Sequence, residues 1–478
     1  MSDPQRPNIL VFLTDDHGHW AMRCAGTREL HTPTMDSLAQ RGAHMTHAFT
    51  PCPVCSPARA SFWTGHIPSR HGIHDHIAEA NVGRDHPGLT GQVNLGMRLQ
   101  EAGYRTGFVG KWHCQASWNV HEGFDFWFSL AHGTQARFGD HHFNDNGIRV
   151  EDHGHQAVRI TDAALRFLRQ PRRSPDEPWF CYVGYTNTHS PFSGEPERLA
   201  EHYRGCSFDD IPNEPFALCH GESKRIRPET PAQSHESRAQ YYAAVSMIDE
   251  QMGRILDELD SRGELENTLI VYTADHGHMN GHHGLWCKGN ATTPQNFLDE
   301  SIRVPCVLAW PAAFAGGQRR SEPVDHCDLH ATLLDAAGTA VSDDASPGCS
   351  YLPLLRGETS SDAWRDAQFC EYANARMVRT EEAKLIRRYP GPNGHFADEF
   401  YDLKADPREM RNLIDDPQWA GVIEQLTARL EEHFARYEDP VRSGPRIADL
   451  PRLNADEPWY RPTGAAARAQ LVAAQKDA

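Results

Sequence analysis

The 478-residue sequence lacks any apolar run long enough to cross a bilayer, and it lacks an excess of positive charge. Lys and Arg number 47 against 65 Asp and Glu, so the formal net charge is −18. Nucleic acids and anionic membranes bind positively charged faces, so neither is expected as a main partner. The first eight residues contain no apolar leader segment, and we therefore expect a cytoplasmic location.

The 12 cysteines lack the dense spacing of a disulfide framework, so we expect reduced thiols. Cys52 and Cys55 form a Cys-x-x-Cys pair, but no second such pair exists to complete a zinc site. On the spacing alone, a redox pair remains an alternative for these two residues.

Continuous apolar runs predict buried strands at residues 8–13, 106–109, 179–185 and 268–273. Apolar residues at helical spacing predict helices over 245–259 and 94–102, with Gly263 and Gly103 at their ends. Strands that alternate with helices predict an α/β fold, with a mostly parallel central sheet flanked by helices.

The pattern changes near residue 363, where short strands are expected at 377–379, 383–388 and 399–403. We predict a large α/β domain over 1–362 that carries the active site, and a small C-terminal antiparallel-sheet subdomain over 363–440. Residues 441–478 are rich in Pro, Arg and Ala. They form either a loose tail or an arm that joins subunits of a homo-oligomer.

The most informative segment, residues 53–65, reads PVCSPARASFWTG. Ser56 suits a helix N-cap, Pro57 the first helical position, and Gly65 the far end. Cys55 would then lie at the helix N-terminus, where unpaired N–H groups favour anions. Arg59, one turn further, can direct its guanidinium to the same place.

This segment resembles the signature of the formylglycine-dependent type I sulfatases of the alkaline phosphatase superfamily, whose core is Cys-x-Pro-x-Arg. The resemblance implies that a formylglycine-generating maturation enzyme oxidises Cys55, and that the hydrated aldehyde supplies a geminal diol as nucleophile. It extends from Pro7 to about Leu413 and implies an alkaline-phosphatase-like fold. Residues 103–113, GYRTGFVGKWH, match the second signature of the family and contain Lys111 and His113.

Acidic residues follow two of the predicted strands: Asp15 and Asp16 follow the first, and Asp275 with His276 follows the strand at 268–273. Ligands of open α/β sheets bind beyond the carboxyl ends of the strands, where converging carboxylates need a cation. The resemblance implies one divalent cation, usually Ca²⁺, held by these four residues and by oxidised Cys55. Many sulfatases carry Asn at position 276; His is typical of the branch that resembles choline and iduronate sulfatases, and it leaves Mn²⁺ open.

The resemblance also assigns roles to the other site residues. Arg59, Lys111 and Lys288 would stabilise charge on the sulfuryl oxygens. Asp275 would take a proton from the attacking hydroxyl, and His189 with Lys288 would protonate the leaving alcohol. His113 would then deprotonate the second hydroxyl, so that sulfate leaves by elimination.

Other polar residues could line a substrate pocket or equally serve packing: His74, His76, Arg137, His141, His142 and Trp286. The segment 325–330, DHCDLH, could suggest a second metal, but an ordinary helix follows it, with Gly338 at its end, and we favour that interpretation.

The predicted function is hydrolysis of a sulfate monoester, either a sulfated carbohydrate or another small alkyl or aryl sulfate. One alternative is a phosphonate monoester or phosphodiester hydrolase of the same superfamily. Its members tend to lack the Lys-x-His pair that this chain retains. The other alternative is a non-catalytic homologue that binds sulfated ligands with Cys55 unmodified.

Overall fold

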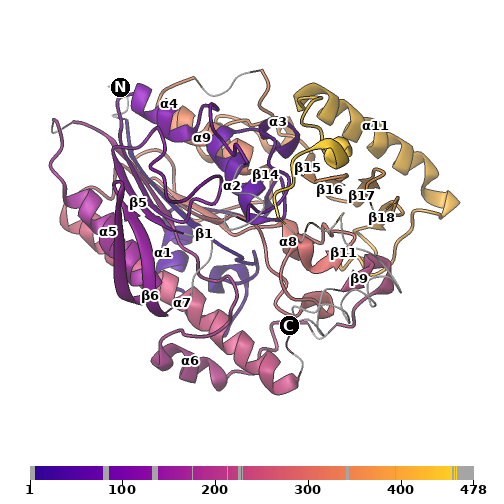
Figure 1. Cartoon of the computed structure of the whole chain (residues 1–478), viewed down its shortest axis with the longest axis horizontal. Helices are drawn as coiled ribbons and strands as arrows, with labels where there is room; N and C mark the ends of the chain where they lie inside the picture. Colours follow the sequence, from indigo (N-terminus) through magenta and orange to yellow (C-terminus); the bar gives the residue numbers. More distant parts are fainter. Residues whose placement is uncertain are drawn as a thin grey trace.

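The computed structural model of the chain (Figure 1) describes residues 6–78, 86–131, 138–174, 176–212, 214–223, 228, 230–340, 344–392, 394–454, 457 and 459. The described part contains one large sheet, helices on both of its faces, and a smaller sheet built from the C-terminal region.

The large sheet has ten strands, in the order β13 (Gln318–Arg320), β2 (Ala43–Met45), β12 (Cys306–Ala309), β10 (Thr268–Ala274), β1 (Asn8–Thr14), β8 (Trp179–Gly184), β4 (Arg105–Gly110), β5 (Phe126–Leu130), β6 (Phe138–Asp145) and β7 (Ile148–His155). The five central strands, from β10 to β5, all pair in parallel. Antiparallel pairs join β12 to both of its neighbours, β5 to β6, and β6 to β7. The prediction of a parallel sheet therefore holds for the five central strands, whereas the sheet as a whole contains both parallel and antiparallel pairs.

Strand β1 divides the core, because successive side chains of a strand point to opposite faces. Leu10 and Phe12 belong to the core under α1 (Pro33–Arg41), α5 (Gln156–Arg169) and α7 (Pro231–Ser261). Ile9, Val11 and Leu13 belong to the core under α2 (Cys55–Thr64), α4 (Leu95–Glu101), α9 (His326–Ala336) and α10 (Leu352–Leu355). A strand buried on both faces has no polar alternation, which explains its continuous apolar run.

The predicted helices are present, and one of them is longer than the apolar pattern indicated. The periodic stretch at 245–259 lies inside α7, which begins at Pro231 because Thr230 and Gln233 form a capping box there. Asn94 caps α4 through the Met97 N–H.

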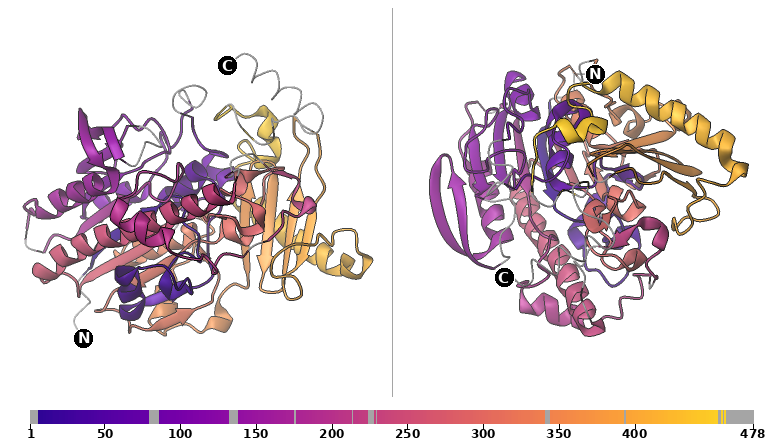
Figure 2. Two further views of the ribbon diagram at one scale, coloured as in Figure 1. Left: turned by 90° about the horizontal axis from the view of Figure 1, so that it is seen from below. Right: turned by 45° about the vertical axis from the view of Figure 1, so that its right-hand side comes forward.

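The predicted small antiparallel sheet near the C-terminus is confirmed. Its four strands are β15 (Ala367–Tyr372), β16 (Ala375–Thr380), β17 (Ala383–Arg388) and β18 (Glu399–Asp402), each antiparallel to its neighbour. Helix α11 (Ala420–Tyr437) lies beside this sheet, as Figure 2 shows. Its Leu426, Leu430 and Phe434 are buried in one cluster with side chains of the sheet. The apolar pattern of the sequence does not predict β15 or α11.

Short elements connect these layers. They are η1 (Arg23–Ala25), β3 (Ala48–Phe49), α3 (Pro68–His71), α6 (Glu197–Arg204), η3 (Leu218–His220), β9 (Glu222–Ser223), η4 (His282–Gly284), η5 (Gly289–Ala291), β11 (Thr292–Thr293), α8 (Asp299–Ile302), β14 (Val324–Asp325), η6 (Ser361–Ala363), η7 (Pro417–Trp419) and η8 (Gly444–Asp449). Among the described residues, no helix combines the length and the apolar character needed to cross a membrane.

The described part of the C-terminal tail packs against its own chain. Leu453 and Trp459 are each only 2% exposed, and Asn454 donates to Asp75 Oδ2 at 3.0 Å. Tyr460 and residues 461–478 lie outside the described residues. The subunit-joining arm therefore stays a prediction.

Candidate active site

Two neighbouring parallel strands bring the predicted metal ligands together. Thr14 at the end of β1 is in register with Ala274 at the end of β10, and the Asp275 N–H donates to Thr14 O at 3.0 Å. The loop after each strand therefore begins at the same edge of the sheet. Glycine is required at position 277, because a Cβ there would lie 2.1 Å from the carbonyl oxygen of Glu300.

Helix α2 places Cys55 at its first position. The N-cap is Val54, which has extended backbone angles, and not Ser56 as the sequence pattern predicted. The Ser56 hydroxyl instead accepts from the Ile77 N–H at 3.0 Å, which holds a neighbouring loop. The predicted end at Gly65 is confirmed, since Gly65 has the left-handed backbone (φ 72°) typical of a helix C-terminus.

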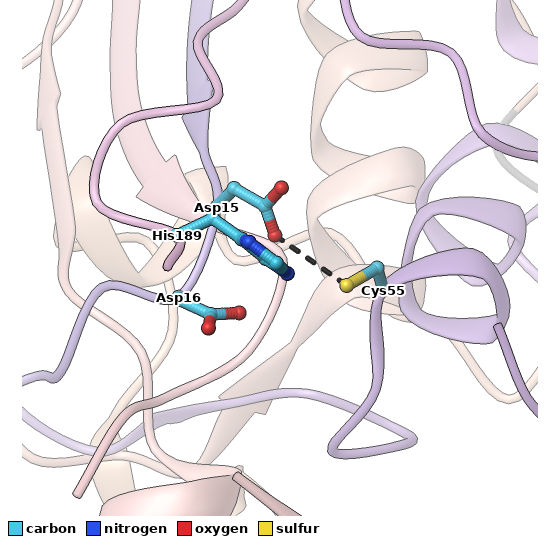
Figure 3. Close-up of side chains that lie close together, drawn as sticks. All are labelled: Asp15, Asp16, Cys55 and His189. Carbon is cyan, nitrogen blue, oxygen red and sulfur yellow. Dashed lines mark hydrogen bonds between the residues drawn. The ribbon is translucent and has the colours of Figure 1, made fainter. Parts of the chain in front are cut away.

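The Cys55 thiol is the centre of the site. Its Sγ lies 3.4 Å from Asp15 Oδ1, 3.3 Å from His276 Nε2 and 2.9 Å from Lys288 Nζ. Figure 3 shows Asp15, Asp16 and His189 directed toward the same space, with the Asp15–Cys55 contact marked. The side chain of Cys55 is thus not buried in apolar surroundings but enclosed by charged groups.

Three cations balance the three carboxylates of the site. Lys111 contacts Asp15, Lys288 contacts Asp16, and Arg59 Nε donates to Asp275 Oδ2 at 2.9 Å. Burial alone would raise the pKa of Asp15, but Lys111, His189 and Arg59 together hold that pKa well below its usual range. Burial would likewise raise the pKa of Asp16, and Lys288 is the main group that lowers it. Asp15 and Asp16 are therefore charged and able to bind a cation.

His276 has the orientation of a metal ligand. Its Nδ1–H donates to the carbonyl oxygen of Gly277 at 2.9 Å, which leaves the lone pair on Nε2. That nitrogen lies 3.3 Å from an oxygen of Asp16 and 3.4 Å from an oxygen of Asp275. Burial lowers the pKa of His276, so the ring is neutral.

The donor set fits a divalent cation. Potential ligand atoms of Asp15, Cys55, Asp275 and His276 all lie within 4.8 Å of one another, and the same holds for Asp15, Asp16, Cys55 and His189. The buried Oδ2 of Asp16 has no hydrogen-bond partner, so it has an unused lone pair that a cation could engage. Oxygen-rich sites of this kind suit Ca²⁺, while the imidazole nitrogen also suits Mn²⁺.

The remaining predicted site residues surround this centre. His189 donates from Nδ1 to the carbonyl oxygen of Ser190 at 2.7 Å, which leaves Nε2 for the site. Lys111 and His113 would point to the same side if strand β4 continued through them. The strand ends at Gly110, however, and His113 has a left-handed backbone (φ 56°). Its Nε2 lies 3.1 Å from Ile77 O, while the buried Nδ1 has no partner. Burial and the nearby Lys111 hold the pKa of His113 well below its usual value, so the ring is neutral.

Several supporting residues carried no recognisable sequence signal. The Tyr182 hydroxyl, inside β8, accepts from Arg59 at 2.9 Å, and Thr188 Oγ1 donates to the carbonyl oxygen of Asp16 at 2.8 Å. His326 at the start of α9 lies 2.8 Å from the carbonyl oxygen of Asp275. His278 is fully buried, stacks on Tyr241, and lies 3.7 Å from Asp16 Oδ2. Only the tertiary fold identifies these residues.

The weaker candidates are scattered. His74 lies 2.7 Å from the carbonyl oxygen of Arg442, and His141 and His142 lie in the β6–β7 hairpin. His76 contacts Asp75, and Trp286 packs on Phe192 with 5.6 Å between ring centroids. Arg137 lies outside the described residues. The segment 325–330 begins α9 with an Asp325 capping box, as the helix interpretation expected.

Comparison with known sequences agrees with this geometry. Residues 7–339 match the sequence model of the sulfatase family, and residues 281–436 match that of the N-sulphoglucosamine sulphohydrolase C-terminal region. The chain belongs to the sulfatase family: it is a sulfuric ester hydrolase, a type I sulfatase of the alkaline-phosphatase-like superfamily.

Particular relatives cover most of its length. An N-acetylglucosamine-6-O-sulfatase of Bacteroides thetaiotaomicron is 28% identical, over 91% of this chain and 88% of the relative. The uncharacterized sulfatase YidJ of Escherichia coli (strain K12) is 30% identical, over 92% and 89%. A protein solved in complex with its substrate D-glucosamine-2-N,6-O-disulfate superposes with a TM-score of 0.75 at 27% identity, over 90% of this chain and 98% of that one. A phosphonate monoester hydrolase of Agrobacterium radiobacter shares the fold, with a TM-score of 0.70 at 22% identity, over 90% and 96%.

Proposed function

We propose that this chain removes sulfate from a sulfated carbohydrate, or from another small sulfate ester, through a formylglycine made from Cys55. The observation that carries the proposal is the position of Cys55 Sγ, within 3.4 Å of Asp15, His276 and Lys288 at once. The preference for a sugar is supported by relatives that act on glucosamine sulfates.

Formylglycine explains why a cysteine occupies this place. In its hydrated form formylglycine supplies a geminal diol, in which one hydroxyl serves as the nucleophile and the other allows sulfate to leave by elimination. An ordinary structural cysteine would be expected in an apolar environment. Cys55 instead lies at the start of α2 among the site's charged groups, a position that suits attack on an anionic ester.

We propose Asp15, Asp16, Asp275 and His276 as ligands of one divalent cation, with Ca²⁺ preferred and Mn²⁺ as the alternative. A bound cation supplies positive charge that polarises a sulfate oxygen and makes a nearby hydroxyl more acidic. Asp275 accepts that hydroxyl's proton, a role supported by the 2.9 Å bond through which Arg59 Nε holds the carboxylate at Oδ2.

The basic residues have the remaining catalytic roles: charge stabilisation and proton transfer. Lys111, Lys288 and Arg59 stabilise the negative charge that develops on the sulfuryl oxygens. His189, with Nε2 left for the site, protonates the leaving alcohol, assisted by Lys288. His113 accepts the proton of the second hydroxyl, a role that its neutral ring and unpartnered Nδ1 support.

The test begins with the state of Cys55 in protein produced together with a formylglycine-generating enzyme. Trypsin releases residues 42–59, a peptide that contains both Cys52 and Cys55, so Cys52 is an internal control within the same fragment spectrum. We expect formylglycine at position 55 and cysteine at position 52. Unmodified cysteine at both positions would favour the non-catalytic homologue.

The substrate test uses sulfated sugars, choline sulfate, aryl sulfates and phosphonate monoesters, each with the cation supplied and removed. Highest kcat/KM on a sulfated sugar is expected. Highest kcat/KM on a phosphonate would favour the rival hydrolase, whose fold this chain shares. We also propose a cytoplasmic location, which cell fractionation tests.

A further inference from the structure

A cavity lies at the end of α2 opposite Cys55. Its volume is about 510 Å³, and it is open to solvent. The ionisable side chains that line it are Arg70, Arg98, Arg442, His66, His330 and Asp439. They come from the loop before α3, from α3, α4 and α9, and from the C-terminal segment. Figure 1 shows α3, α4 and α9 gathered on one side of the sheet.

Positive charge predominates in this cavity although the chain as a whole is acidic. Among the described residues that line the cavity, three carry a guanidinium group and one, Asp439, carries a carboxylate. Among the described residues, neither Arg70 nor Arg98 forms an ion pair within 4.0 Å. Arg98 donates to the carbonyl oxygen of Ala340 at 3.0 Å. Arg442 donates to the carbonyl oxygen of Arg70 at 3.0 Å, and its Nε lies 3.6 Å from Asp439 Oδ2.

Other arginines on the surface of this chain have carboxylate partners. Arg166 donates twice to Asp145, at 2.8 Å each, and Arg429 contacts Asp366. Positive charges that line one cavity attract a small anion.

We propose that this cavity is a binding site for a small ligand that carries a sulfate or phosphate group. Arginine suits both groups, because its planar fork donates two parallel hydrogen bonds to a tetrahedral oxyanion. The volume is in the range of small-molecule sites and would hold an anionic sugar.

The cavity is separate from the catalytic centre. All ten residues of α2 are buried, and the nine steps from Cys55 to Thr64 span about 14 Å of helix. The proposal therefore rests on the charges of the cavity and not on the chemistry at Cys55. A bound anion would join α3 and α4 to Arg442, and so would hold the C-terminal segment against the large domain.

The experiment is isothermal titration of the full chain with inorganic sulfate, inorganic phosphate and glucosamine 6-sulfate in separate arms. Arg70→Gln with Arg98→Gln removes two charges and keeps side-chain volume, while Arg166→Gln is the matched control on a paired surface arginine. Turnover of a small aryl sulfate is measured for each variant, because it reports the catalytic centre independently.

For at least one of the three probes, we expect a binding event in the wild type and in Arg166→Gln that weakens about tenfold or more in the double variant. Turnover of the aryl sulfate should stay unchanged. The probe that binds most tightly then identifies the source of the anion. If the double variant does not fold, Arg98→Gln is compared with Arg98→Lys, and the lysine variant, which keeps the charge, should bind more tightly than the glutamine variant. Equal binding in all variants, or no binding beyond the catalytic centre, would overturn the proposal.

Discussion

Substitution of Lys384 by methionine should destabilise the junction between the two sheets. Lys384 is fully buried on β17, where Nζ donates to Phe297 O at 2.8 Å and Asp299 Oδ1 at 2.8 Å, and contacts Glu409. Methionine keeps most of the volume but leaves Glu409 without its cation, whereas Asp299 still has Arg379 at 2.9 Å. In the variant Glu409 keeps the hydrogen bond from the Asp299 N–H at 2.8 Å but has lost its lysine partner, and Phe297 O loses a donor.

The magnitude follows from the burial of the pair. Removal of one partner of a buried ion pair costs about 3–5 kcal/mol. An unfolding entropy of about 2.1 cal/mol/K per residue gives about 1 kcal/mol/K for a chain of this length, so the melting temperature should fall by roughly 3–5 °C. Lys404→Met is the matched control, because Lys404 pairs with Glu382 and both side chains are more than 60% exposed. Solvent screens such a pair, so its loss should shift the melting temperature far less.

The penalty in Lys384→Met should also grow with pH. Burial already raises the pKa of Glu409, and Lys384 partly opposes that rise. Without Lys384 the folded-state pKa rises further, while the unfolded chain keeps the ordinary value. A carboxyl group with a raised folded-state pKa destabilises the fold once it ionises. The free energy of unfolding therefore falls as pH rises from the unfolded-state pKa of Glu409 through its folded-state pKa. Calorimetry at pH 5 and pH 8 measures this, and an equal loss in both variants, or one independent of pH, would refute the reasoning.

Three further predictions concern the active site. Asp275→Asn should remove the stabilisation of the fold by Ca²⁺. At a Ca²⁺ concentration of about 100 times Kd this amounts to about 2.7 kcal/mol, or roughly 3 °C in melting temperature by the same conversion. If Ca²⁺ raises the melting temperature of the variant as much as that of the wild type in a thermal-denaturation assay, Asp275 is not a ligand. His189→Ala should lower kcat about 10²–10⁴-fold for alkyl sulfates and much less for nitrophenyl sulfate, whose leaving group needs no proton; equal losses on both would contradict the leaving-group role. Tyr182→Phe should leave Arg59 bound to Asp275 and lower kcat/KM about tenfold, since it removes one hydrogen bond to a charged group. Steady-state kinetics on an aryl sulfate test this. A variant with the kcat/KM of the wild type would show that Tyr182 does not support catalysis.

Much of the fold could be predicted because its signals are local. The runs at residues 8–13 and 268–273 are continuous and apolar because β1 and β10 are buried on both faces. The segment at 53–65 contains its own proline and terminal glycine, so a helix was predicted from neighbouring residues alone. Only the first turn was wrong, since the extended backbone of Val54 places the N-cap two residues before Ser56.

Local patterns failed where stability comes from packing. Helix α11 buries three side chains against a sheet that lies earlier in the chain, and β15 pairs only with β16, so neither has a strong signal of its own. Tyr182 looked like any other strand residue, because its bond to Arg59 crosses 123 positions of sequence.

The sequence by itself determined which chemical groups the active site contains: a cysteine at a helix start, acids after two strands, and a lysine–histidine pair. The tertiary structure alone decided their geometry, because the parallel pairing of β1 with β10 joins segments about 260 residues apart and turns separate acids into one cluster. It also formed the arginine-lined cavity at the end of α2, because the spacing of residues along the chain does not show which distant charges lie together in the fold.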